Sequence, residues 1–271
     1  MKLLFSYPPT SHSADKLLLS LLFGQHMAAY LWIDPLTHQP VKGAFFQLEN
    51  WDSESFIDNF LTECGLDSDT PFSVQVCFDA PQITQMPVAQ YERSKLDLLQ
   101  KATYPHQNTL LFLHESFANW QFYLCYAVPT ILFRTLESRF LDLTYYHAIK
   151  GLLKDSSANQ DAGVIHLHVG IDQVLIVLSR SSRLLFTGYF NYQHEMDIVY
   201  YLLRLTAIHG LSTDTVQLLL AGLIDPASRL FEEISNYFLH VQTTDNAVRF
   251  DAEALPAHYF TLLTNNPVCA S

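Results

Sequence analysis

The stretch GVIHLHVGIDQVLIVLSRSSRLLFTGYF, residues 163–190, is the part of the sequence that decides the predicted fold. It contains three runs rich in Val, Ile and Leu, each of a length that β-strands prefer. Gly170-Ile171-Asp172 separates the first run from the second, and Arg180-Ser181-Ser182 separates the second from the third. Both separating triplets are typical of turns. The stretch therefore predicts a meander of three strands.

The residues after this meander alternate between helical and strand patterns. A helix is expected from about Tyr192 to His209, because apolar residues recur on one face and Gly210 follows. The remaining elements predicted are a strand at Val216–Leu220, a helix at Pro226–Phe238 and a strand at His240–Thr243.

The first half of the chain has the same order of elements. Three strands are expected at residues 17–23, 26–33 and 41–48, followed by a helix that ends at Gly65 and a strand at 71–78. Pro87 suggests the first turn of a second helix that runs to about Lys101. The last elements predicted are an aromatic hairpin at about 109–127, a helix after Pro129, a strand at 140–143 and a helix at 145–154.

The polar run Asp155–Asp161 predicts a boundary between two domains, residues 1–158 with the inserted hairpin and residues 159–271. A chain of 271 residues is long enough for two domains.

Four segments carry a resemblance to known proteins. They are the meander 163–190, the helical segment DIVYYLL at 197–203, the segment LLLAG at 218–222 and Met86-Pro87. Through them the chain, from about Leu17 to Thr243, resembles an uncharacterised bacterial family, DUF3822, and the actin-like domains of pilus-assembly and type II secretion proteins. The resemblance implies an α/β protein with mixed sheets, in which two tandem ribonuclease H-like units form an actin-like ATPase fold.

Actin-like ATPases hold ATP with an acidic residue and a glycine at the first turn of each half, and with a glycine pair after the fourth strand of the second half. The matching turns here are Leu22-Phe23-Gly24, which has no carboxylate, and His168-Val169-Gly170, where histidine replaces the acid. Asp172 lies two residues late, and Gly222 alone remains of the glycine pair. The resemblance therefore implies a degenerate nucleotide cleft at Gly24, His168, Gly170, Asp172 and Gly222, with no catalytic residue and no cofactor.

The pair His166-Leu167-His168 allows a second interpretation. Residues i and i+2 of a strand point to the same face, so both imidazoles, with Asp172 nearby, are candidates for binding a metal ion that activates water. Further ligands are not identified by the sequence. The other interpretation is that both histidines are buried and hydrogen-bonded beneath a helix or at a domain cleft.

The aromatic hairpin is apolar on both faces, so it must be covered twice. Strand alternation predicts Trp120, Phe122 and Tyr126 on one side. One face is expected to pack against its own domain, and the other face against either the other half of the chain or a protein partner.

The composition excludes several classes of function. The net charge is −12, and the fifty residues between Lys42 and Arg93 contain no Lys or Arg, so nucleic acid is not an expected partner. No apolar run has the roughly 18 residues that a membrane helix needs. The four cysteines form no C-x-x-C pair and are typical of free thiols in a reducing compartment, so a cytoplasmic location is expected.

These observations favour a non-catalytic actin-like scaffold or assembly protein that binds a protein partner or a second copy of itself. The alternative is an enzyme that uses the cleft between the halves, either as a weak ATPase or as a metal-dependent hydrolase with His166 and His168.

Overall fold

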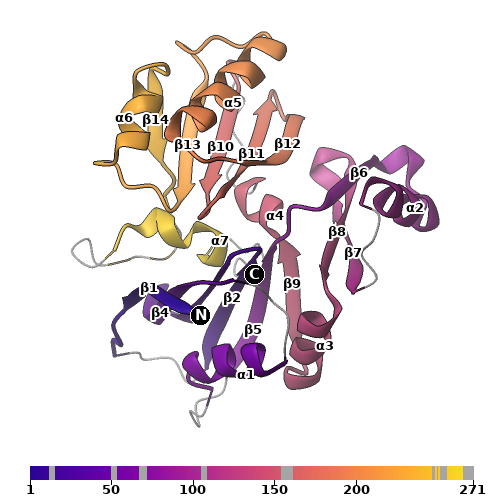
Figure 1. The fold of residues 1–271 in the computed structure, drawn as a ribbon, viewed down its shortest axis with the longest axis vertical. Coiled ribbons are helices and arrows are strands. Elements are labelled where there is room, and N and C mark those ends of the chain that lie inside the picture. The colour runs from indigo at the N-terminus through magenta and orange to yellow at the C-terminus, as the bar shows by residue number, and fades with distance from the viewer. Residues whose placement is uncertain are drawn as a thin grey trace. The chain divides into compact units, whose positions relative to one another are not determined.

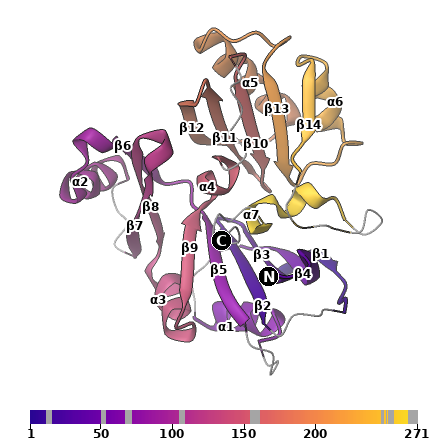
Figure 2. The same ribbon diagram turned by 180° about the vertical axis from the view of Figure 1, so that it is seen from behind.

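The computed structural model of the chain is shown in Figures 1 and 2. It describes residues 1–11, 16–49, 54–66, 72–104, 109–153, 161–245, 248, 250 and 255–264. The chain divides into two compact units, Met1–Ala148 and Ile149–Ser271, called here the first and the second unit. The domain boundary expected at residues 158–159 lies outside the described residues.

The first unit is built on a six-stranded mixed sheet with the strand order β1-β4-β3-β2-β5-β9. Strands β1 to β4 pair antiparallel, and β2-β5 and β5-β9 pair parallel. The strands are β1 (Lys2–Tyr7), β2 (Leu17–Gly24), β3 (Met27–Asp34), β4 (Gln39–Gln47), β5 (Phe72–Asp79) and β9 (Leu143–His147). The strands predicted at 17–23, 26–33, 41–48 and 71–78 are therefore confirmed.

The burial of the side chains explains which strands could be predicted from the sequence. Every residue of β2 and β3 is buried, as expected for strands covered on both faces that read as continuous apolar runs. Strand β1 was not predicted, because it lies at the edge of the sheet and most of its side chains are exposed.

Helices α1 (Glu54–Glu63) and α3 (Thr130–Arg139) belong to the first unit and contact each other. Phe60 of α1 is fully buried, and its ring centroid lies 5.3 Å from that of Phe23 and 5.9 Å from that of Phe46. These contacts attach α1 to the sheet.

A smaller antiparallel sheet with the order β6-β8-β7 completes the first unit. It contains β6 (Ile83–Pro87), β7 (Leu110–Phe117) and β8 (Phe122–Pro129), with the short 3-10 turns η1 (Val88–Gln90) and η2 (Ala118–Trp120) and helix α2 (Arg93–Thr103). The predicted aromatic hairpin is the pair β7-β8.

Three predicted boundaries between Pro87 and Leu153 were wrong. The helix expected at Pro87 begins at Arg93, because Pro87 ends β6, an edge strand in which a residue without an N–H is tolerated. The strand expected at 140–143 is β9, Leu143–His147, since the backbone N–H of Phe140 still donates to the Leu136 carbonyl and caps α3. The helix expected at 145–154 is accordingly shorter, α4 (Ala148–Leu153).

The second unit is a five-stranded mixed sheet with the order β12-β11-β10-β13-β14. Strands β10 (Val164–Val169), β11 (Gln173–Arg180) and β12 (Arg183–Asn191) form the predicted antiparallel meander, while β13 (Gln217–Gly222) and β14 (His240–Thr243) continue the sheet in parallel. Its other elements are α5 (Glu195–Ile208), α6 (Arg229–Ser235), η3 (Ala257–Phe260) and α7 (Thr261–Thr264).

The core of the second unit lies on one face of this sheet. Leu167 and Val169 of β10 pack there in one buried cluster with Ile198 and Leu202 of α5. Because side chains alternate along a strand, His166 and His168 lie on the opposite face of β10. None of the helices in the described ranges is both long and apolar enough to span a membrane.

Candidate functional site

The turn after β10 is closed by hydrogen bonds within the second unit. The backbone N–H of Gly170 donates to the carbonyl of Gln173 at 2.9 Å. The hydroxyl of Tyr192 donates to the carbonyls of Gly170 at 2.9 Å and Ile171 at 3.0 Å. The backbone N–H of Tyr192 donates in turn to the carbonyl of Asp172 at 3.0 Å. The N–H of Gly170 is therefore engaged by the protein itself.

The end of β13 lies directly beside this turn, because Val169 and Gly222 are partners in the parallel pair β10-β13. Gly222 has a φ of +79°, and a Cβ on it would lie 2.3 Å from the carbonyl oxygen of Val169 and 2.9 Å from Nε2 of His168. The N–H of Leu223 donates to the Val169 carbonyl at 2.8 Å, and the N–H of Ile224 donates to the Gly222 carbonyl at 2.8 Å.

Phosphate-binding glycine loops work differently, because their N–H groups point toward the anion. At the ends of β10 and β13, the N–H groups of Gly170, Leu223 and Ile224 donate to carbonyls instead, and the His168 imidazole occupies the space next to Gly222. The structure thus brings His168, Gly170 and Gly222 together, as the sequence predicted for a nucleotide site, but in a closed arrangement.

Both histidines of β10 are buried, with 1% of His166 and 2% of His168 exposed. Burial lowers the pKa of each imidazole to about 4, so both are neutral near neutral pH. Neutral imidazole is the form that binds metals. A metal site needs at least three ligand atoms close together. Among the described residues, His166, His168 and Asp172 do not bring their ligand atoms within 4.8 Å of one another.

Gly24 of the first unit lies at the end of β2, paired with Asp79 at the end of β5. A Cβ at Gly24 would lie 3.5 Å from the carboxylate oxygen Oδ2 of Asp79, so the two residues are close neighbours. The sequence indicated no carboxylate at the turn after β2, but Asp79, only 2% exposed, supplies one from the adjacent parallel strand. Sequence reasoning could have found Asp79 from the rule that neighbouring parallel strands end at the same edge of a sheet.

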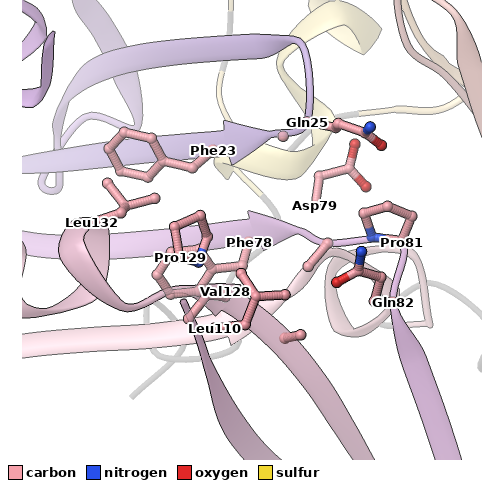
Figure 3. Close-up of a pocket in the computed structure, with 13 residues that line it drawn as sticks. Phe23, Gln25, Phe78, Asp79, Pro81, Gln82, Leu110, Val128, Pro129 and Leu132 are labelled. Atoms are coloured by element: carbon pink, nitrogen blue, oxygen red, sulfur yellow. The ribbon is translucent and has the colours of Figure 1, made fainter. Parts of the chain in front are cut away.

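These two residues line a pocket of about 170 Å³ in the first unit. In Figure 3, Asp79, Gln25 and Gln82 gather at one end of it, and apolar side chains form the other end. The apolar part comes from the ends of β2 and β5, from the hairpin β7-β8 and from α3, with Phe23, Phe78, Leu110, Val128, Pro129 and Leu132. The pocket therefore combines a mostly apolar wall with one buried carboxylate.

The three hairpin residues expected on a partner surface are placed differently. Tyr126 is fully buried, with its ring 4.8 Å from that of His147 and 6.4 Å from that of Phe78. Phe122 is 6% exposed and stacks on Phe117. Trp120 lies in η2 rather than in a strand and is half-buried. Of the three, Trp120 alone has substantial surface to offer a partner.

Two mixed sheets, each a meander followed by parallel strands and covered by helices, define an α/β protein with the actin-like ATPase fold. The chain belongs to the DUF3822 family, described as protein of unknown function, whose model matches residues 10–241. The predicted fold and the predicted family are both confirmed.

Two solved structures are similar to the chain over most of its length. One is a protein of Bacteroides thetaiotaomicron with actin-like ATPase fold and unknown function, which is 16% identical, with a TM-score of 0.70 over 91% of this chain and 95% of that one. The other is the PilM-PilN type IV pilus biogenesis complex, in which the matching chain is 12% identical, with a TM-score of 0.60 over 91% of this chain and 96% of that one. At these identities the similarity shows the fold alone. A search of curated proteins gave no match.

Proposed function

We propose that this protein is a non-catalytic actin-like scaffold or assembly component that binds a protein partner. The observation that carries the proposal is the closed arrangement at the ends of β10 and β13. There the N–H groups of Gly170, Leu223 and Ile224 already donate to carbonyls, and His168 lies against Gly222. A phosphate would have to replace those hydrogen bonds and displace the imidazole, which makes tight nucleotide binding unfavourable.

The pocket of the first unit supports the binding part of the proposal. Its volume of about 170 Å³ is below the roughly 300–1,000 Å³ of typical small-molecule sites, and is close to the ~150 Å³ cavity that accommodates one benzene ring. It therefore suits one large apolar side chain. The Asp79 carboxylate at its polar end favours a Lys or Arg next to that side chain. The net charge of −12 also favours a basic segment.

The comparison with PilM-PilN gives a further reason at the level of the fold. A protein structurally similar to this chain was solved in a complex of type IV pilus biogenesis. We infer that the occupant of the pocket is a segment of a partner protein with an apolar anchor residue and a neighbouring cation.

Ala80→Trp is expected to abolish partner binding. Ala80 lines the pocket and is half-buried, so a larger side chain there fills the pocket without entering the core. The measurement is quantitative mass spectrometry of proteins that co-purify with the tagged full chain from its native cells. We expect at least a tenfold loss of the partner captured by the wild-type protein.

The matched control is Ala118→Trp, which adds the same side chain at an exposed residue of η2. It should retain the partner. Light scattering of the purified protein is measured in parallel, so that an oligomer lost only in Ala80→Trp identifies a second copy as the occupant. Equal capture by both variants and the wild type would exclude this pocket.

The nucleotide prediction is tested separately. Isothermal titration calorimetry with ATP and Mg²⁺ is expected to give no binding in the micromolar range, and phosphate release should equal that of buffer. Micromolar binding, or phosphate release that disappears in Asp172→Ala, would instead support the alternative function, a weak ATPase.

A further inference from the structure

Three side chains of the kind that binds metals meet on the small sheet of the first unit. They are Asp97 from α2, His114 from β7 and Cys125 from β8, and their ligand atoms all lie within 4.8 Å of one another. His114 and Cys125 are direct partners in the antiparallel pair β7-β8, so their side chains share one face of the sheet. Helix α2 contacts β8 and supplies Asp97. Three separate elements thus contribute one ligand each.

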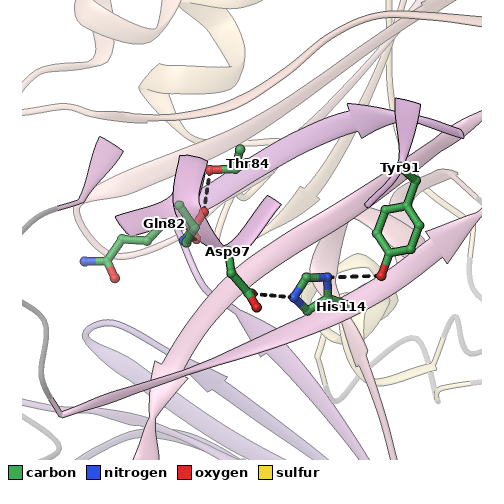
Figure 4. Close-up of polar contacts among 6 residues, drawn as sticks. Gln82, Thr84, Tyr91, Asp97 and His114 are labelled. Atoms are coloured by element: carbon green, nitrogen blue, oxygen red, sulfur yellow. Dashed lines mark hydrogen bonds and ion pairs between the residues drawn. The ribbon is translucent and has the colours of Figure 1, made fainter. Parts of the chain in front are cut away.

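The imidazole of His114 is held in a defined orientation. Its Nε2 lies 2.8 Å from Oδ1 of Asp97, and its Nδ1 faces the hydroxyl of Tyr91 at 3.5 Å (Figure 4). The ring of Tyr91 is itself fixed by stacking on Tyr123, with centroids 3.6 Å apart and planes at 14°. In metalloproteins a ligating histidine is commonly oriented in this way by a polar partner at its other ring nitrogen.

We propose that Asp97, His114 and Cys125 form a zinc site. Oxygen, nitrogen and sulfur donors together are the ligand types that Zn²⁺ accepts at about 2.0–2.3 Å, and three protein ligands leave one tetrahedral position for water or another ligand. On binding, the ion replaces the hydrogen bond between Asp97 and His114. The Cys125 thiol forms the Zn–S bond and its proton passes to solvent.

The weak core of this part of the unit gives such an ion a structural role. The buried apolar cluster at α2 is small: Leu96 of α2 packs with Met86 and Cys125, and three partly buried residues, Tyr91, Phe112 and Tyr123, pack against them. Apart from Leu96 and Gln100, the side chains of α2 are not buried. Small substructures with little buried apolar surface commonly use a metal as a cross-link. The side chain of Asp97 is 33% exposed and that of His114 is 9% exposed, so an ion reaches the site from the Asp97 side. Zinc would attach α2 to the hairpin.

The test uses the full chain, stripped with EDTA and titrated with Zn²⁺ by calorimetry and with Co²⁺ by absorption spectroscopy. We expect one ion per chain and a cobalt spectrum with a thiolate charge-transfer band. Asp97→Ala and Cys125→Ser should each weaken binding by at least about 100-fold, and Tyr91→Phe, which alters only the orienting contact, by about 10-fold.

Cys64→Ser is the matched control, because Cys64 is also a buried free cysteine of the first unit. It should bind zinc like the wild type. If Cys125→Ser does not fold, Asp97→Ala still tests the site. The Asp97 side chain lies partly exposed on the surface of α2, so this variant is expected to fold. Failure of the wild-type protein to bind either ion, a cobalt spectrum without the thiolate band, or unchanged affinity in Asp97→Ala would overturn the proposal.

Discussion

Lowering the pH from about 7 to about 4 is expected to destabilise the second unit by an amount on the order of 6 kcal/mol, through His166 and His168. Burial lowers the pKa of both imidazoles from 6.5 to about 4, so between these pH values the unfolded chain binds protons that the folded chain does not. The stability that depends on these neutral histidines is fully present above pH 6.5 and is lost as the pH falls toward 4. The loss is about 1.4 kcal/mol per pH unit for each histidine.

A loss of this size is comparable to the roughly 5–15 kcal/mol that stabilises a whole domain, so we expect acid unfolding in this pH range. The measurement is urea unfolding followed by circular dichroism at several pH values. His147 in the first unit has a pKa lowered to about 4 by burial as well, and therefore adds a slope of the same sign. A comparison of variants is needed to isolate the pair on β10.

The double variant His166→Gln, His168→Gln is expected to have a shallower dependence of the free energy of unfolding on pH, whatever its absolute stability. His240→Gln, which changes an exposed histidine on β14, is the control and should keep the wild-type slope. The explanation would be wrong if the double variant and the wild type lost stability equally between pH 6.5 and 4.

The elements that the sequence predicted well are those whose pattern is local. The meander 163–190 and strand β14 were predicted almost to the residue, because apolar strands bounded by turn residues carry their own signal. Pro87 misled the prediction of α2, because its φ of −56° fits the end of a strand as well as the first turn of a helix.

The candidate sites were harder to predict, because they depend on contacts between distant segments. Asp79 lies beside Gly24 because β2 and β5 pair in parallel, so the rule that parallel strands end at one edge of a sheet indicates Asp79 only once that pairing is assumed. His114 and Asp97 meet because α2 folds over the hairpin. Burial also separates the prediction from the structure at Tyr126, because strand alternation predicts which face a side chain shares but not whether that face lies inside the unit, where Tyr126 is fully buried.

Gly222→Ala is the most direct test of the closed arrangement at the end of β13. A φ of +79° costs a residue with a Cβ about 1–2 kcal/mol, and forcing a methyl group into a packed site costs about 1–3 kcal/mol more. We therefore expect a loss of about 2–5 kcal/mol in the free energy of unfolding, measured by urea denaturation at neutral pH.

The control is Gly210→Ala, at a φ of +61° with no atom within 4 Å of the added Cβ. It carries the backbone strain without the steric contact, so it should cost only about 1–2 kcal/mol. The difference between the two variants measures how tightly the Val169 carbonyl and the His168 imidazole enclose Gly222. An end of β13 that was open for a phosphate would tolerate the methyl group, and the two variants would then lose equal stability. A larger loss in Gly222→Ala means that this glycine serves the packing of His168 and of the β10-β13 pair, as the proposed closed arrangement at the end of β13 requires.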